Sequence, residues 1–596
     1  MSVLDRIERL RNVMEQQKVD CYIIPTDDYH HSEYVGDYFK FREYITGFTG
    51  SAGTAVFTKD KAGLWTDGRY FIQAEAQLQG SGITLYKSGE PGVPTIEEFL
   101  KSELKEGDVL GFDGRTVTYA QGKRYCHIAD ENGASLKYSL DFAQNIWKER
   151  PEMSMESVFS LADEYTGEKI GSKLERIREI MKENGCNAHV LSSLDDIAWL
   201  LNIRGNDIAY CPLVLSYAIV YNNSVELFAD IRKFSDDIIN LLAENQVKIY
   251  PYEDIYRKVS EMTSEDKLLL DSAIMNYSLY QSISKETVIV DKQNPEILMK
   301  SVKNETQAEN LRKAHLKDAV AHTKFMYWLK KNIGRVEITE LSASARLEGL
   351  RAEQEHFLGP SFGPISAYGE HGAIVHYSAD EKSNVPLKEG KLFMTDTGGH
   401  YLEGSTDITR TVALGEVGNI EKEHFTLVAR AMLRLANTVF LYGCSGANLD
   451  CIAREVFWKE GLNFNHGTGH GVGYLLNIHE GPINFRWKEG ERPAPALEEN
   501  MVITDEPGIY IEGSHGIRLE NELLVRKTVK NEYGQFMNFE ILTYVPIDLD
   551  AILPEKMSTE EKEMLNHYHK QVYEKVSPYL SEEERSWLKE YTRAVK

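Results

Sequence analysis

Long hydrophobic runs are missing from this sequence of 596 residues. The most apolar stretch, residues 212–221, is too short to cross a bilayer, and it contains Ser216 and Tyr217. Charged residues are spread through residues 1–20, so the beginning of the chain lacks the apolar core of a secretion signal. We therefore expect a soluble, cytoplasmic protein that does not associate with membranes.

Cysteine is scarce as well, with six residues in the whole chain and no Cys-x-x-Cys pair among them. Six cysteines in a chain of this length are too few to form a disulfide framework. The sequence also lacks any low-complexity segment. These absences favour a reduced, intracellular, globular protein.

Positive charge is in deficit, because Lys and Arg number 67 against 92 Asp and Glu, for a net charge of -25. An acidic surface of this size repels the phosphates of nucleic acids and of anionic lipids. Nucleic acid is therefore excluded as an expected partner. The apolar fraction of 42% and the charged fraction of 27% are ordinary for globular domains, and the length predicts several of them.

The first half of the chain contains a weak internal repeat. A helix-spaced apolar stripe at residues 7–14 precedes a strand-like run at 21–25 and a pair of acids, Asp27 and Asp28. The same order returns from residue 174, with a strand near 189–191 followed by Asp195 and Asp196. Two α/β modules, at residues 1–155 and 156–303, explain this order, although α/β modules also share it by chance.

A third domain is expected over residues 304–596. Asn304 with Gln307 is typical of a helix N-cap and its partner at the third position, and the helix is expected to run to Lys331. Strands and Gly-rich turns then alternate with helices, and residues 558–596 have a helical pattern. The expected fold class is therefore α/β followed by α+β.

Two aspartates in this third domain are candidates for a shared site. An apolar strand ends at Asp396, and a Gly-rich turn leads to a returning strand that begins near Asp407. A hairpin of this kind brings both carboxylates to one face, where they repel unless a cation or a proton separates them. The alternative for either residue alone is an N-cap or turn aspartate.

Histidine and glycine are concentrated in residues 465–473, which contain His466 and His470 among four glycines. Glycine permits a close approach of the backbone, and histidine supplies a metal-binding nitrogen or carries a proton. A single histidine is usually structural, but two in such a glycine-rich segment favour function. His479 follows shortly afterwards.

Two further segments contain acidic residues that are candidates for the same site. An apolar strand leads to Glu506 before a Pro-Gly turn, and Arg518, Glu520 and Glu522 share one face if residues 516–522 form a strand. A surface ion pair between Arg518 and Glu520 is the alternative, and it would contribute little. We also expect a short apolar strand at residues 373–377, which would carry His376.

Together these segments supply four carboxylates and one imidazole: Asp396, Asp407, His470, Glu506 and Glu520. The set is too acidic for a structural zinc site, and it suits two hard divalent ions, with Mn²⁺ favoured over Zn²⁺. Paired metals polarise a carbonyl and generate hydroxide at neutral pH, so the reaction class indicated is metal-assisted hydrolysis.

The order of these five residues and their local motifs resembles the dinuclear-metal peptidases of the pita-bread fold, such as methionine aminopeptidase, prolidase and aminopeptidase P. Two modules before the catalytic domain resemble the long, three-domain form of aminopeptidase P. Segments at residues 50–54, 65–70 and 199–205 are similar to that form as well. The resemblance implies two creatinase-like modules followed by a pita-bread catalytic domain with a helical tail.

The resemblance also implies roles for individual residues. One metal would be held mainly by Asp407, His470, Glu506 and Glu520, and the other by Asp396, Asp407 and Glu520. His376, His479 and Glu506 would be catalytic residues, with the two histidines contacting the scissile carbonyl.

Three further residues receive roles in the same way. His466 would line the pocket for proline, and Arg518 would support the nearby acids. Arg69 would reach towards the substrate from the first module.

The function implied is that of a proline-specific aminopeptidase, in which a metal-bridging hydroxide attacks the first peptide bond when proline follows it. The cofactors would be two divalent ions, Mn²⁺ before Zn²⁺ or Co²⁺, and a homodimer is expected. A prolidase-type dipeptidase is the first alternative. A non-catalytic peptide-binding protein on the same scaffold is the second, and loss of a ligand residue would favour it.

Overall fold

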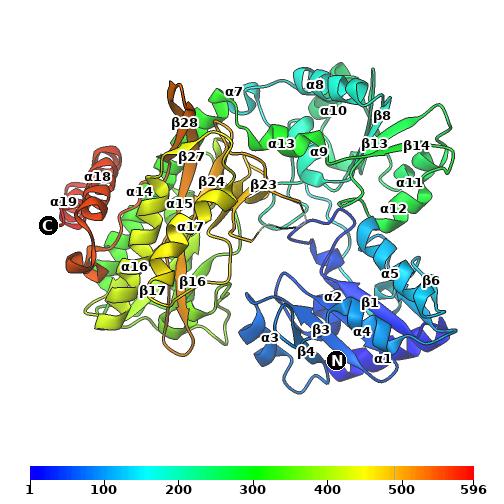
Figure 1. Ribbon diagram of the computed structural model, residues 1–596, viewed down its shortest axis with the longest axis horizontal. Coiled ribbons are helices and arrows are strands. Elements are labelled where there is room, and N and C mark those ends of the chain that lie inside the picture. Colours follow the sequence, from blue (N-terminus) through cyan, green and yellow to red (C-terminus); the bar gives the residue numbers. More distant parts are fainter. Residues whose placement is uncertain (489, 491) are drawn as a thin grey trace. The chain divides into compact units, whose positions relative to one another are not determined.

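The computed structural model describes residues 1–488, 490 and 492–596 (Figure 1). The chain forms two compact units, one of residues 1–161 and 168–296, the other of residues 162–167 and 297–596. Within the described part of the chain, no helix has both the length and the apolarity that crossing a membrane requires.

The first unit contains two six-stranded mixed sheets. In strand order, the first is composed of β4 (Thr84–Lys87), β3 (Ala62–Thr66), β2 (Thr54–Thr58), β1 (Cys21–Pro25), β5 (Val109–Phe112) and β6 (Ser135–Lys137). The second is composed of β12 (Val247–Tyr250), β11 (Val225–Phe228), β10 (Tyr217–Tyr221), β8 (Ala188–Leu191), β13 (Lys267–Leu270) and β14 (Val288–Asp291).

Both sheets follow one topology. The strands β1, β2 and β3 pair antiparallel, as do β8, β10 and β11, and the outer strands of both sheets pair parallel. Amphipathic helices complete the modules, led by α1 (Val3–Gln16) before the first sheet and α8 (Ile170–Glu183) before the second. The repeat predicted from the sequence is therefore a repeat of topology.

The remaining helices of this unit are short or moderate in length. They are α2 (Phe41–Thr46), α3 (Phe71–Gln77), α4 (Ile96–Glu103), α5 (Tyr119–Glu131), α6 (Ala143–Ile146), α9 (Leu194–Leu200), α10 (Asp236–Glu244), α11 (Asp254–Ser260) and α12 (Tyr277–Ser282). Many begin at Ser, Thr or Asn residues whose side chains accept a backbone N–H of the first turn, which satisfies an otherwise unpaired donor.

A buried histidine joins the two modules inside this unit. His30 faces the carbonyl of Ser192 through Nδ1 at 2.9 Å and the hydroxyl of Tyr252 through Nε2 at 2.6 Å. Because a carbonyl only accepts, Nδ1 donates to it, and Nε2 accepts the hydroxyl proton of Tyr252 when the ring is neutral. Burial lowers the pKa of His30 to about 4, in agreement with this arrangement.

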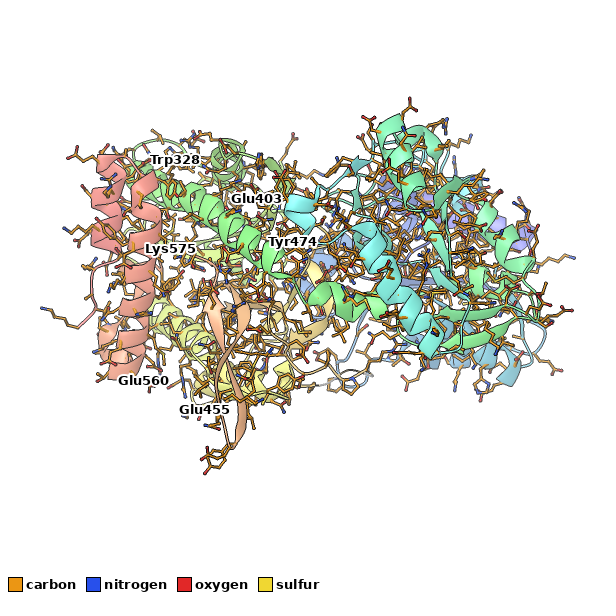
Figure 2. All side chains as sticks on the ribbon, turned by 90° about the horizontal axis from the view of Figure 1, so that it is seen from above. Trp328, Glu403, Glu455, Tyr474, Glu560 and Lys575 are labelled. Carbon is orange, nitrogen blue, oxygen red and sulfur yellow. The ribbon has the colours of Figure 1, made fainter. Side chains whose placement is uncertain are left out.

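The second unit is arranged around the 28-residue helix α14 (Glu305–Asn332). Asn304 caps this helix and exchanges hydrogen bonds with Gln307, as the sequence predicts. The helix packs against α15 (Glu340–Ala352) and against the C-terminal helices α18 (Thr559–Val576) and α19 (Glu582–Tyr591). Figure 2 shows α18 and α19 beside each other, and Leu588 of α19 is fully buried, as expected for a packing residue.

Three sheets of this unit carry the candidate site. The first is composed of β16 (Ile365–Tyr368), β17 (Lys391–Thr397) and β20 (Ile408–Leu414). The second is composed of β21 (Phe440–Leu441), β28 (Gly534–Ile541), β27 (Asn521–Asn531), β24 (Val502–Asp505), β22 (Gly469–Val472) and β23 (His479–Phe485). The third is a hairpin of β25 (Gly508–Ile511) and β26 (His515–Arg518). A smaller sheet is composed of β15 (Phe357–Pro360), β18 (Gly399–Tyr401) and β19 (Gly404–Ser405), and the last two of these strands lie in the connection between β17 and β20.

The expected strand at residues 516–522 is interrupted. Strand β26 ends at Arg518 and β27 begins at Asn521, and the two belong to different sheets. Glu520 lies in the break, where its backbone N–H donates to the carbonyl of Thr409. This bond turns Glu520 towards the β17–β20 hairpin instead of along a continuous strand.

A short segment at residues 162–167, which we call the strap, packs on α14. The segment 162–167 contains α7 (Asp163–Thr166) and belongs to the second unit, although residues on both sides of it belong to the first. The side-chain amide of Asn304 donates to the carbonyl of Thr166 at 2.8 Å, and that of Asn310 donates to the carbonyl of Glu164 at 2.9 Å. The same amide of Asn310 contacts the hydroxyl of Tyr474, which is labelled in Figure 2.

Candidate functional site

The β17–β20 hairpin places the two candidate aspartates. Asp396 is the penultimate residue of β17 and pairs with Thr409, while Asp407 directly precedes β20. Both side chains are largely buried. The ligand oxygens of Asp396, Asp407 and Glu520 all lie within 4.8 Å of one another. The predicted hairpin therefore brings the two aspartates together and adds Glu520 to them.

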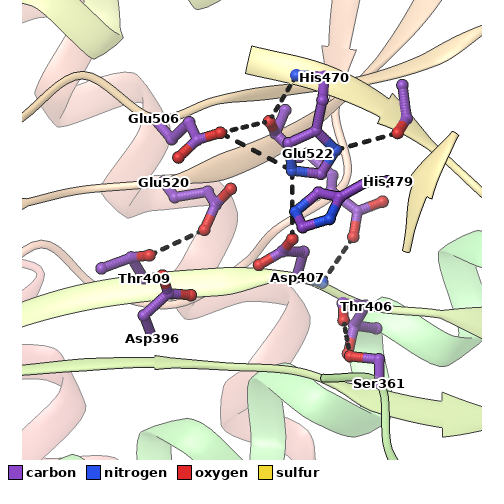
Figure 3. Close-up of polar contacts among 12 residues, drawn as sticks. Ser361, Asp396, Thr406, Asp407, Thr409, His470, His479, Glu506, Glu520 and Glu522 are labelled. Atoms are coloured by element: carbon purple, nitrogen blue, oxygen red, sulfur yellow. Dashed lines mark hydrogen bonds and ion pairs between the residues drawn. The ribbon is translucent and has the colours of Figure 1, made fainter. Parts of the chain in front are cut away.

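Glu506 completes the acidic cluster from the six-stranded sheet. It directly follows β24, and its ligand oxygen lies within 4.8 Å of the ligand nitrogen of His470 and the ligand oxygen of Glu520. Glu520 is oriented by Thr409, whose hydroxyl donates to its Oε2 at 2.8 Å. Figure 3 shows these acids converging from segments at the ends of separate strands.

His470 on β22 faces the acids through one ring nitrogen. Its Nδ1 lies 3.0 Å from the carbonyl of Gly471, which only accepts, so Nδ1 carries a proton. Nε2 lies 3.5 Å from Asp407 Oδ2 and 3.7 Å from Glu506 Oε1 (Figure 3). Nε2 is therefore the ring nitrogen that would face a metal held among these acids.

The acids of this cluster cannot all carry charge without a compensating cation. Burial, followed by the neighbouring carboxylates, raises the pKa of Asp407 and Glu520 well above the ordinary range, and burial also raises that of Glu506. Asp396 Oδ1 is buried and finds no hydrogen-bond partner among the described residues. Carboxylate oxygens with one imidazole are the donors that two hard divalent ions prefer, so the residues fit a dinuclear metal centre.

Two more of the predicted histidines lie near this cluster. His479 opens β23, and its ring centroid is 4.3 Å from that of His470. Its ligand nitrogen also lies within 4.8 Å of those atoms of Asp407 and His470, so it can serve as a ligand or as a substrate contact. His376 lies in the loop after the short 3₁₀ helix η3 (Gly369–Ala373) and not in the strand expected there, and the carbonyl of the preceding Val375 lies 3.4 Å from Arg518 Nη2.

A chain of hydrogen bonds joins His466 to the acids. His466 Nε2 lies 2.8 Å from the hydroxyl of Tyr510, which accepts from Arg518 Nη1 at 2.7 Å. Arg518 is buried, and its guanidinium binds Asp396 Oδ2 through Nε and Nη2. Burial lowers the pKa of His466 to about 3, so this ring is neutral. Arg518 thus contacts an acid of the cluster, and the supporting role that the family resemblance implies for it stays a prediction.

Arg69 belongs to the first unit and is engaged locally. Its Nε and Nη2 donate to the two carboxylate oxygens of Asp67, each at 2.8 Å. The side chain remains partly exposed. Its expected role towards substrate stays a prediction.

Three residues of the site were not singled out from the sequence as site residues. Tyr510 bridges His466 and Arg518, and Thr409 orients Glu520. Glu522 Oε1 accepts the backbone N–H of Asp407 at 2.7 Å. Glu522 carried a signal in its alternation with Glu520, whereas Tyr510 and Thr409 occur in strands without any distinguishing pattern.

Comparison with known families matches almost the whole chain. Residues 6–137 and 149–307 match models of the creatinase/prolidase N-terminal domain. Residues 309–527 match metallopeptidase family M24, and residues 535–595 match the C-terminal region of peptidase_M24.

Individual relatives are similar over their full length. Xaa-Pro aminopeptidase 1 of Dictyostelium discoideum is 36% identical over 99% of this chain and 96% of its own, and aminopeptidase P1 of Arabidopsis thaliana is 34% identical over 99% of both. The crystal structure of X-prolyl aminopeptidase from Caenorhabditis elegans, a cytosolic enzyme with a di-nuclear active site, matches with a TM-score of 0.95 and 33% identity over 100% of both chains.

A more distant structure shares the fold over part of the chain. The Xaa-Pro dipeptidase from Bacillus anthracis matches 64% of this chain and 99% of its own, with a TM-score of 0.51 and 24% identity.

Proposed function

We propose, for a chain that belongs to the Xaa-Pro aminopeptidase family, that it releases the first residue from peptides with proline at the second position. The observation that supports this most strongly is the convergence of Asp396, Asp407 and Glu520, with His470 and Glu506 beside them. These residues stand in a chain that resembles aminopeptidases over its full length. Fold alone would leave the chemistry open, whereas the site residues favour hydrolysis.

The cofactors proposed are two divalent ions. Asp407, His470, Glu506 and Glu520 would hold one of them, and Asp396, Asp407 and Glu520 the other. The excess of oxygen donors favours Mn²⁺ over Zn²⁺ or Co²⁺. When bound, the ions supply Lewis acidity towards the scissile carbonyl and lower the pKa of water.

The chain's own residues would orient the substrate and move protons. Burial raises the pKa of Glu506, which makes its carboxylate a stronger proton acceptor beside the scissile bond. His376 and His479 would donate to the carbonyl oxygen as negative charge develops on it. The free amino group of the peptide would bind beside Asp407.

His466 would select proline. Its ring is neutral at physiological pH, because burial lowers its pKa to about 3. A neutral ring held by Tyr510 gives a fixed, weakly polar wall that suits an apolar pyrrolidine ring. Arg518 would hold the His466 ring and Asp396 at fixed positions relative to each other, because it binds both Tyr510 and Asp396.

Several further properties are proposed with the activity. We expect a cytoplasmic homodimer, and the C. elegans relative is itself a cytosolic enzyme. Arg69 would contact the substrate. We also propose that the first and second modules end near residues 155 and 303.

The deciding experiment compares three substrates with protein that is stripped of metal and then reloaded with Mn²⁺. We expect metal-dependent release of Xaa from Xaa-Pro-Yaa, and little release from Xaa-Ala-Yaa or from the dipeptide Xaa-Pro. Cleavage of the dipeptide alone would establish a dipeptidase instead. No cleavage of any peptide by metal-loaded protein would favour a peptide-binding role on this scaffold.

A further inference from the structure

A buried glutamate lies at the start of α15, outside the acidic cluster. Glu340 is fully buried, and its backbone is fixed on both sides. Its N–H donates to the carbonyl of Val385 at 3.2 Å, and its carbonyl accepts from the hydroxyl of Ser366 at 2.7 Å. The carboxylate therefore projects from a rigid support.

Three donors from one short segment converge on this carboxylate. Oε1 accepts the backbone N–H of Tyr368 at 2.7 Å and lies 2.8 Å from Nδ1 of His371. Oε2 accepts from the hydroxyl of Tyr377 at 2.8 Å. The rings of His371 and Tyr377 stack on each other, with centroids 4.5 Å apart. One carboxylate thus fixes the beginning and the end of the loop at residues 368–377.

The interior of the same loop is held from the opposite direction. Arg518 Nη2 lies 3.4 Å from the carbonyl of Val375. Gly372 packs so closely on Gly516 of β26 that a Cβ added to Gly516 would lie 1.6 Å from the carbonyl oxygen of Gly372. Backbone contact of this kind leaves the loop little freedom to shift along β26.

His376 is therefore flanked by two restrained neighbours. Val375 before it contacts Arg518, which also binds Asp396, and Tyr377 after it binds Glu340. We propose that Glu340 is a positioning residue, which holds Tyr377 and His371 so that His376 meets the scissile carbonyl of the peptide. This inference rests on the proposed function of the site and deepens it, because it names the group that fixes a substrate-contacting histidine.

The energetic basis is the cost of a misplaced donor. A histidine that must meet a carbonyl oxygen within hydrogen-bond distance loses much of its effect when it moves by about 1 Å. A buried carboxylate with several donors resists such movement, because releasing any one of them leaves an unsatisfied buried group. The hydrogen bond to Glu340 also raises the pKa of His371, which shows how strongly the two groups interact.

The first test is Tyr377→Phe, which removes one hydroxyl and keeps the ring. We expect kcat/KM for Xaa-Pro-Yaa to fall by about 3- to 10-fold, the equivalent of one lost hydrogen bond. Tyr368→Phe is the matched control, because the hydroxyl of Tyr368 donates to the carbonyl of Lys388 at 3.0 Å and not to Glu340. We expect this control to cleave like the wild-type protein.

The decisive readout is a double-mutant cycle with His376→Ala. If Tyr377 acts through His376, Tyr377→Phe should reduce cleavage by less than about twofold in the His376→Ala background. An equal loss in both backgrounds would overturn the inference, because the hydroxyl would then act independently of His376.

Glu340→Gln provides a second variant with a larger expected effect. Cleavage should fall by about 10- to 100-fold, because hydrogen bonds to a charged acceptor are lost, while the metal content of the reloaded protein stays that of the wild type. Metal content that falls in parallel with activity would overturn the positioning role. If Glu340→Gln does not fold, Tyr377→Phe with its cycle decides the question.

The two proposals fail in different ways. Wild-type protein that cleaves no Xaa-Pro peptide would remove the proposed function. An active wild type with an equally active His376→Ala variant would overturn the role of His376 and the positioning role of Glu340 with it. A defective His376→Ala beside fully active Tyr377→Phe and Glu340→Gln variants would overturn the positioning role alone.

Discussion

Two sets of buried acids, one in each compact unit, have opposite surroundings. In the first unit, Asp207 is buried against the equally buried Lys233, and its Oδ2 also accepts the backbone N–H of Leu215. In the second unit, Asp407 and Glu520 are buried against other carboxylates, and burial, followed by that proximity, raises the pKa of both.

The comparison shows that the groups surrounding a buried acid, and not the acid itself, indicate a functional site. A buried acid with a lysine is neutral as a pair and contributes to the fold once it has formed. Acids buried together store repulsion that only a cation or a proton relieves. Removing Asp207 from the first unit should therefore destabilise the protein, whereas removing Asp407 from the second should stabilise the metal-free protein.

The largest effect on activity is expected from Asp407→Asn, which removes one carboxylate from the acidic cluster. Cleavage of Xaa-Pro-Yaa should fall on the order of a thousandfold, since both metals would lose a shared ligand. Without metal, however, the variant should melt about 2–4 °C above the wild type, because repulsion is relieved. Activity assays and thermal melts of stripped protein check both signs, with exposed Glu532→Gln as the control. A lower melting temperature for stripped Asp407→Asn would contradict the comparison.

Asp207→Asn should do the reverse. It leaves Lys233 charged and buried without its partner, so the free energy of unfolding should fall by about 3–5 kcal/mol. Denaturant titration measures this loss, and the folded fraction should keep its normal cleavage rate. Asp254→Asn, which breaks the exposed pair with Arg257 in the same unit, should have a much smaller effect. Equal losses in the two variants would show that burial is not the cause.

A third prediction uses the neutral histidine between the two modules. The pKa of His30 is about 4 in the folded protein and 6.5 in its ordinary state, so the unfolded chain binds more protons between these values. Its contribution to stability is fully present above pH 6.5 and is lost as the pH falls towards 4, by up to about 3 kcal/mol. Between pH 7 and pH 4, the free energy of unfolding should change less with pH for His30→Gln than for the wild type. Parallel pH profiles would refute the assignment.

The smallest effect is expected from Thr409→Val, which sharpens the description of the cluster. It removes the hydroxyl that orients Glu520 and should weaken metal binding by about tenfold. Calorimetric titration of stripped protein with Mn²⁺ gives the affinity. Thr411→Val is the matched control on the same strand, because its hydroxyl binds the backbone of Arg518 and not a carboxylate. Comparable weakening by both variants would mean that strand stability, and not orientation, controls the affinity.

Local patterns in the sequence predicted much of this fold. The capping pair of Asn304 and Gln307 located the start of α14, and the repeated order of elements anticipated two sheets of one topology. The acidic strand ends around Asp396 and Asp407 anticipated a hairpin, which the register of β17 and β20 confirms. Each of these signals depends on residues that are neighbours in sequence.

Long-range contacts could not be predicted from such local patterns, because they join residues that are far apart in the sequence. Glu340 precedes Tyr377 by 37 positions, and no periodicity links them. The break between β26 and β27 was missed because the alternation from Arg518 to Glu522 continues unchanged across it. Only the different sheets on either side, and the bond from Glu520 to Thr409, reveal the turn.

The strap at residues 162–167 limits how this protein can be divided. Its carbonyls at Glu164 and Thr166 bind the side-chain amides of Asn310 and Asn304 at the beginning of the longest helix. A fragment that starts at residue 297, where the main body of the second unit begins, would leave both amides without these acceptors. Gene fusions or shortened versions meant to transplant the peptidase portion alone must therefore carry an internal piece of the preceding module with them.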